Sequence, residues 1–364
     1  MLIGQLIKYY RQKAGLTQEE LGKGICSVTH VSKIERGQSP YSSEIIKLFS
    51  ERLHIDLETE VNWLENLENR LHHWHKVIII QKMKEVEEIK KELETIPFIE
   101  HSQHSALYYL IQARYYMLKK DLTQTCALLT KVQSEYPELP PFERNLFRHV
   151  RGIYYMLTIR YSKTENYQKA INILKEIDVN EYGNLECYFH LAAAYQGIES
   201  PVLAYVYAEK ALRYFKENDH FLGAILAESI MLISVGSEIG GDFKDVEAAY
   251  QKLIYNSEML NAPDKKTTLL NNLGHEYYRR KNYQQANKVL KEALRLVPKP
   301  SVLYLQRWHN YLRTILEGKL TRKADLLKKA REGLAMAKEL DNTVYKFVFR
   351  LLIYRIEDKQ DQYF

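Results

Sequence analysis

A chain of 364 residues is too long for one compact core, and it predicts a small domain followed by a larger one. Glycine (15 residues) and proline (9) are scarce, and long helical periods are frequent, so we expect an all-α fold. The net charge of +6 permits contact with nucleic acid but does not require it. Three widely separated cysteines exclude a disulfide framework or a metal knuckle and suit a reducing cytoplasm.

The N-terminal segment has neither a long apolar core nor a small-residue cleavage site, so no signal peptide is predicted. The longest apolar run, Val77 to Ile80, is far too short to span a bilayer. We therefore expect a cytoplasmic protein without membrane contact.

Four short helices are predicted in residues 1–56. The first covers residues 2–14 and stops at Gly15. Thr17 and Glu20 form a capping box that starts the second helix. Ser27 caps the third helix, which runs from about residue 28 to 36. The fourth covers residues 43–53, with a predicted apolar stripe of Ile45, Leu48, Phe49 and Leu53.

The segments LTQEEL and VSKIERG, joined by a short turn, are typical of a helix-turn-helix that reads DNA. Residues 1–56 resemble the phage-repressor-like (XRE, Cro/C1) family. That resemblance implies a phosphate or base contact by Gln18 at the start of the second helix. It also implies DNA contacts from the exposed face of the third helix, by Ser27, Thr29, His30 and Lys33, with Arg36 on a phosphate.

Not every residue of this segment is expected to contact DNA. Some of these side chains could be solvated helix surface, while Glu35 is expected to tie the bundle together and Ile34 to be core. Residues 1–40 carry six Lys and Arg against three Asp and Glu, so a single domain should bind DNA weakly. Tight binding would need two domains on one DNA face, and a homodimer is therefore expected.

Residues 57–98 are predicted to form linker helices over 57–71 and 74–93, rich in paired opposite charges. The HHWH run places His72 and His75 on one helical face, which allows two metal ligands. Because no third ligand lies at suitable spacing, an aromatic-rich inter-domain or dimer contact is favoured over a metal site, and no cofactor is expected.

The stretch from Thr267 to Pro298 shows the small-large pattern of a tetratricopeptide (TPR) helical hairpin. Gly274 and Ala286 mark a predicted close approach of two helices. The first helix carries Leu270, Leu273, Gly274 and Tyr277, and the second carries Ala286, Leu290 and Ala293. Similar units are predicted from residue 105 onwards, near 152–177, 191–211, 230–253 and 301–340. One hairpin cannot bury its apolar faces alone, so residues 99–364 should form a stack, with an apolar helix over 343–356 as its cap or a dimer seam.

Stacked hairpins of this kind are expected to line a groove that suits an extended peptide. Asparagine can bond both sides of a peptide unit, which makes Asn271 and Asn272 candidate ligand contacts. The alternative is a hydrogen bond to the neighbouring hairpin. The other candidate peptide-binding residues are His275, Tyr278, Arg114, Arg151, Gln196 and Glu228.

Over its whole length the chain resembles the RNPP family, the cytoplasmic regulators of Gram-positive bacteria that sense small secreted peptides. The segments ICSVTHVSKIERG, ALRYFKENDHFLGAILAES and LNNLGHEYY carry the resemblance, which is nearest to members of the PlcR and NprR type. It implies a right-handed TPR superhelix, homodimerisation through the repeats and DNA binding switched by a peptide, as in a quorum-sensing transcriptional regulator.

Two rival interpretations come from other classes. In the first, the repeats are an interaction scaffold that holds another protein, such as a response regulator. In the second, the chain is an enzyme. No Ser/His/Asp or Cys/His set, phosphate-binding glycine loop or metal cluster stands at usable spacing in the sequence, so catalysis is not expected.

Overall fold

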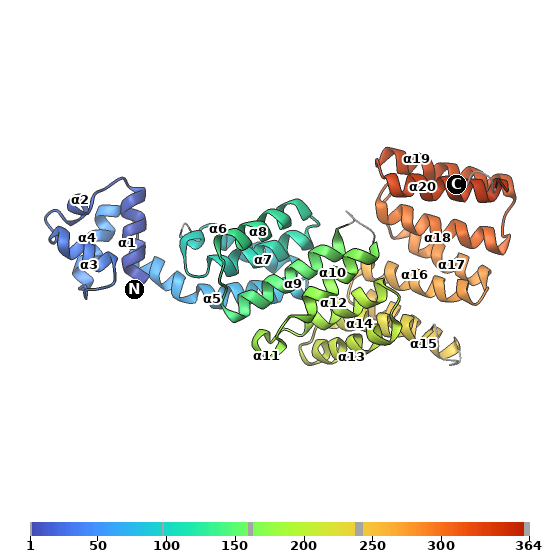
Figure 1. Cartoon of the computed structure of the whole chain (residues 1–364), viewed down its shortest axis with the longest axis horizontal. Helices are drawn as coiled ribbons and strands as arrows, with labels where there is room; N and C mark the ends of the chain where they lie inside the picture. The colour runs from blue at the N-terminus through green and yellow to red at the C-terminus, as the bar shows by residue number, and fades with distance from the viewer. Residues whose placement is uncertain (1, 97, 159–162, 237–242, 360–364) are drawn as a thin grey trace. The chain divides into compact units, whose positions relative to one another are not determined.

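The computed structural model describes residues 2–96, 98–158, 163–236 and 243–359, and in these ranges the chain is helical with no strand (Figure 1). The predicted all-α fold is confirmed. Within the same ranges, none of the helices combines the length and the apolar character needed to cross a membrane.

The four N-terminal helices begin and end close to where the sequence predicts. They are α1 (Leu2–Lys13), α2 (Gln18–Gly22), α3 (Val28–Glu35) and α4 (Ser43–Leu53). The capping box of Thr17 and Glu20 is present, and the Ser27 hydroxyl accepts from the backbone N–H of His30. Side-chain caps therefore fix where α2 and α3 start, as local sequence alone indicates.

The predicted apolar stripe of α4 is wrong at two positions. Phe49 and Leu53 are buried as expected, but Leu48 is exposed and Ile45 is only half-buried. Ile46 is the buried residue instead. The packed face of α4 is therefore formed by Ile46, Phe49 and Leu53. Ile45 and Ile46 are equally apolar, so the sequence does not show which of them packs inward.

The linker contains two helices, as predicted, but the break between them lies at residues 80–82 rather than at 72–73. Helix α5 (Leu57–Ile79) runs straight through the HHWH segment, so the predicted break near residue 72 is wrong. It is followed by α6 (Met83–Glu94) and a short 3-10 turn, Ile99–His101. The rings of His72 and Phe142 lie 4.7 Å apart, and His75 also packs on Phe142. The segment thus makes aromatic contacts within the chain, and an inter-domain or dimer contact stays a prediction.

The chain divides into two compact units. The first contains residues 1–160 and 176–182, and the second contains residues 161–175 and 183–364. Beyond the linker the first unit holds α7 (Ser105–Leu118), α8 (Leu122–Glu135), α9 (Pro141–Leu157) and the short α11 (Val179–Tyr182). The hairpin predicted near 152–177 is therefore shared between units, since α9 belongs to the first and α10 (Lys163–Lys175) to the second.

The second unit continues as helical hairpins in chain order. These are α12 (Glu186–Gly197) with α13 (Pro201–Glu217), α14 (Phe221–Gly236) with α15 (Phe243–Met259), α16 (Pro263–Arg279) with α17 (Tyr283–Arg295), and α18 (Val302–Gly318) with α19 (Lys323–Glu339). Helix α20 (Thr343–Glu357) follows them, as the sequence predicts. The first helices of successive hairpins, α14, α16, α18 and α20, pack against one another along the unit.

The hairpin of α16 and α17 shows why small residues recur in this unit. A methyl group on Gly274 would lie 2.6 Å from the side chain of Leu290 on α17. Ala286 and Ala293, also on α17, are fully buried in the same core as Leu270, Leu273 and Tyr277. The predicted close approach is confirmed, with Leu290 as the residue that fills the space over Gly274.

Candidate functional site

Helix α3 presents a polar face that other described parts of the chain leave open. Ser27, Thr29, Lys33 and Arg36 are exposed and His30 is half-buried, whereas Val31 and Ile34 are buried on the opposite face. The structure therefore places all five predicted DNA-contacting residues around α3 on its solvent side. Their hydroxyl, imidazole, ammonium and guanidinium groups can donate to phosphate oxygens or to base edges.

A buried ion pair orients α3 against α1. Arg11 donates through Nε to Oε1 of Glu35 at 2.6 Å and through Nη2 to Oε2 at 3.1 Å. The prediction that Glu35 ties the bundle together is confirmed, and Arg11 is buried in this pair. Gln18 donates to Oε2 of Glu35 at 2.8 Å, so its side chain is held by the bundle.

The two asparagines of α16 bond neighbouring first helices. Oδ1 of Asn271 accepts from Nδ2 of Asn310 on α18 at 3.1 Å. Nδ2 of Asn272 donates to the Ser229 hydroxyl on α14 at 3.1 Å. The structure thus contains the alternative contact, a bond to the neighbouring hairpin, at both positions. These bonds use one lone pair of the Asn271 amide and one N–H of the Asn272 amide, so each amide retains both donor and acceptor capacity.

His275 and Tyr278 lie on α16 and interact with positively charged arginines of α18. Burial, together with the charges of Arg313 and Arg307, lowers the pKa of His275 to about 4. The guanidinium of Arg313 lies 4.6 Å from the ring centre of Tyr278. These contacts bring α16 and α18 together around one neutral imidazole and two cationic side chains, a set suited to an anionic ligand.

Gln196 lines a pocket of about 330 Å³ that also involves Ser234 on α14 and Arg279 on α16. Glu228 does not share it. Glu228 lines a different pocket and forms an ion pair with Lys216 at 3.2 Å. Of these two candidate peptide contacts, only Gln196 therefore lies in the same pocket as a residue of α16.

Arg114 and Arg151 belong to the first compact unit. Arg114 on α7 is buried. Arg151 on α9 packs over the rings of Phe147 and Tyr155 on its own helix. Both arginines remain candidate ligand contacts of that unit.

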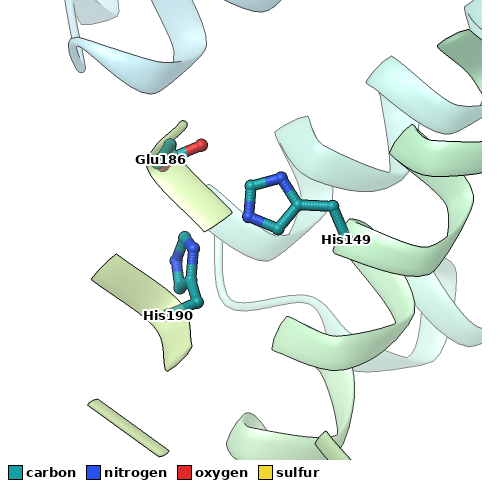
Figure 2. A group of neighbouring side chains, drawn as sticks. All are labelled: His149, Glu186 and His190. Carbon is teal, nitrogen blue, oxygen red and sulfur yellow. The ribbon is translucent and has the colours of Figure 1, made fainter. Parts of the chain in front are cut away.

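Side chains with metal-ligand chemistry occur on α9 and α12 (Figure 2). Glu186 and His190 are four residues apart on α12, so they share one helical face. His149 on α9 is fully buried and pairs with the Tyr182 hydroxyl at 2.9 Å. Two ligands on one helix fall short of the three protein ligands that a zinc site needs.

Three functional candidates escape sequence analysis: Asn310, Arg313 and Arg307, all on α18. Asn310 completes the asparagine pair, Arg313 covers Tyr278, and Arg307 is 94% buried. The signal in the sequence is a pair of arginines in the helix VLYLQRWHNYLRTIL. Only the packing of α16 on α18 shows which side chains these arginines meet.

Comparison with known proteins agrees with this architecture. A helix-turn-helix family model matches residues 7–59. The transcriptional activator NprA of Geobacillus stearothermophilus is 22% identical over 343 residues, covering 90% of this chain and 83% of NprA. Response regulator aspartate phosphatase E of Bacillus subtilis (strain 168) is 21% identical over 301 residues, covering 78% of each chain.

The solved structure of NprR in complex with its cognate peptide NprX matches with a TM-score of 0.68 at 20% identity. The match covers 82% of this chain and 86% of that one. Fold and sequence define an all-α protein in which a helix-turn-helix precedes a series of TPR-like hairpins. The fold and the domain order agree with the predicted resemblance to the RNPP family.

Proposed function

We propose that this chain is a transcriptional regulator whose helix-turn-helix binds DNA and whose hairpin region binds a short signalling peptide that controls DNA binding. The observation that carries the proposal is the exposed polar face of α3, held by the buried Arg11–Glu35 pair within the residues that match a helix-turn-helix. A cytoplasmic location and a homodimer that pairs two such heads belong to the same proposal.

The DNA half of the proposal is tested with Lys33→Ala, matched by Lys47→Ala on α4. Both lysines are exposed, but only Lys33 lies on α3. With DNA fragments selected from a random library, Lys33→Ala should weaken binding, by about 1–3 kcal/mol if the side chain reads a base, and Lys47→Ala should not. Equal binding by all three proteins would overturn the assignment of α3 as the DNA-reading helix.

The peptide half rests on the polar residues of α16 and α18. In NprR, which shares the fold, the solved complex holds the peptide NprX. Here Asn271, Asn272 and His275 supply donors and acceptors to an extended backbone. A ligand that binds one conformation more tightly than another will shift the DNA-binding equilibrium by that difference in affinity.

A second candidate function is the binding of a response regulator. The match to response regulator aspartate phosphatase E favours it, because it covers 78% of this chain. A stoichiometric complex with one response regulator, formed without DNA and insensitive to peptides, would support this candidate. We propose peptide-controlled DNA binding first, and without catalysis, because the helix-turn-helix matches a DNA-reading class.

A further inference from the structure

Arg307 is a buried charge without a counter-ion among the described residues. Its residue surface is only 6% exposed, and its Nε lies buried with no hydrogen-bond partner. No ion pair or hydrogen bond joins it to any other part of the chain that the structure describes. Burial lowers its pKa to about 10, so the guanidinium is still charged at neutral pH.

Two other buried charges among the described residues, Glu276 and Glu35, are paired. Glu276 on α16 is 2% exposed and accepts from Arg279 at 2.7 Å and from Arg280 at 2.5 Å. In the first unit, Glu35 receives two hydrogen bonds from Arg11. An unpaired buried charge costs several kcal/mol, so Arg307 stands out within the same molecule.

Two groups that interact electrostatically with Arg307 are unable to neutralise it. These groups are His275 on α16 and Tyr345 on α20. Burial keeps His275 neutral at pH 7 and raises the pKa of Tyr345, so neither supplies a negative charge. Arg313, which also acts on His275, adds a second positive charge to this place.

We infer that Arg307, with Arg313, forms the anchor for a carboxylate of the ligand, and that the effector peptide is therefore acidic or bound by its C-terminus. This inference rests on the proposed peptide-binding function. A planar carboxylate matches the fork of a guanidinium and forms two parallel hydrogen bonds. Arg307 and Arg313 each stand three residues from Asn310 on α18, and Asn310 donates to Asn271 on α16.

The cost of holding Arg307 unpaired is offset only when the ligand is bound. This makes a neutral ligand of the same shape a poor competitor, because it would leave the charge unmatched. The unpaired arginine therefore supplies selectivity for an anion rather than stability of the empty protein.

The test is affinity selection by the full-length protein from two pools of short peptides of random sequence, one with free C-termini and one with amidated C-termini, read by mass spectrometry. Wild type should enrich peptides that carry a carboxylate. Asp or Glu enriched in the amidated pool identifies a side chain as the ligand group. Enrichment confined to the free-acid pool identifies the C-terminus.

The matched variants are Arg307→Gln and Arg295→Gln, the latter an exposed arginine in the last turn of α17. For the selected peptides, Arg307→Gln should weaken binding by about 30-fold or more, whereas Arg295→Gln should bind as wild type does. Arg307→Lys, which keeps the charge but loses the fork, should recover only part of the affinity.

A second readout does not require any peptide. Arg307→Met should raise the midpoint of thermal unfolding of the empty protein, because it removes an unmatched buried charge. A lower midpoint would mean that Arg307 stabilises the fold and would overturn the inference. Circular dichroism of each variant shows whether it is folded.

The outcomes separate the two claims. If wild type enriches no peptide from either pool, the proposed peptide-binding function fails. If it enriches peptides without preference for a carboxylate, or if Arg307→Gln binds them equally well, peptide binding stands and the carboxylate anchor is overturned.

Discussion

Asn310 donates a side-chain hydrogen bond to Asn271 at 3.1 Å and so joins α18 to α16. Asn271 is 4% exposed, and its bond crosses between the first helices of two successive hairpins. A contact at this place links any ligand on α16 to the packing of the next hairpin. The same residue pair can thus serve both stability and signal transmission.

Replacing Asn271 with alanine should leave the Asn310 amide without its partner. Because Asn310 is only half-buried, the free energy of unfolding should fall by about 0.5–1.5 kcal/mol, the net contribution of one hydrogen bond. Chemical denaturation measures it. The exposed Asn66→Ala on α5 is the control and should be near neutral. A fall no larger than that of the control would show that the pair contributes nothing.

Replacing Gly274 with alanine should destabilise the α16–α17 hairpin. The added methyl group would meet Leu290 at 2.6 Å, and overpacking of this kind costs about 1–3 kcal/mol, partly offset by the better helix propensity of alanine. In a mutant cycle with the double variant Gly274→Ala/Leu290→Ala, the Gly274→Ala change should destabilise the protein less when Leu290 is already alanine than it does in wild type. Purely additive effects would contradict the close approach.

Stability should fall as the pH drops from about 6.5 to about 4. Burial, with Arg313 nearby, lowers the pKa values of both His275 and His309 to about 4, whereas in the unfolded chain histidine titrates near 6.5. Between these values the unfolded state binds more protons, so acid favours it.

The measurement is the urea midpoint of wild type and of the double variant His275→Gln/His309→Gln at about pH 7 and about pH 4.5. The variant should lose less stability than wild type across this interval. Arg279, Arg307 and Glu276 also act on the pKa of His275, and Glu276 accepts hydrogen bonds from Arg279 and Arg280. An equal loss in both proteins would remove these histidines from the explanation.

Breaking the Arg11–Glu35 pair should unfold the N-terminal bundle locally and abolish DNA binding. Glu35→Ala leaves a buried guanidinium unpaired, at a cost of about 3–5 kcal/mol. Hydrogen exchange of α1 and α3 reports the local stability. The exposed Glu44→Ala on α4 is the matched control and should retain both protection and DNA binding. Normal exchange in Glu35→Ala would refute the role given to the pair.

Sequence alone predicts the features that depend on neighbouring residues. The Thr17–Glu20 box and the Ser27 cap fix helix starts through local hydrogen bonds, and both are present. The Gly274 spacing reveals a close approach because only a small residue can occupy it. Where two adjacent residues are equally apolar, as at Ile45 and Ile46, the pattern does not fix which one is packed.

The polar residues that α16 and α18 bring together were predictable from the sequence only in part. Asn271 and His275 stand out because asparagine and histidine interrupt a hairpin pattern. Arg307 and Asn310 lie on α18 and interact with residues of α16, which is far away in the sequence. The length of each hairpin decides which side chains of the two helices meet. The periodicity of a single sequence does not show how the side chains of one hairpin align with those of the next.

The most direct test of the account is the affinity of the full-length protein for its selected DNA, titrated with and without a peptide selected by the same protein. We predict a change of several-fold or more in the dissociation constant, lost in Arg307→Gln and retained in Arg295→Gln. A dissociation constant unchanged by every selected peptide would contradict the central claim that the hairpin region controls the DNA-binding head.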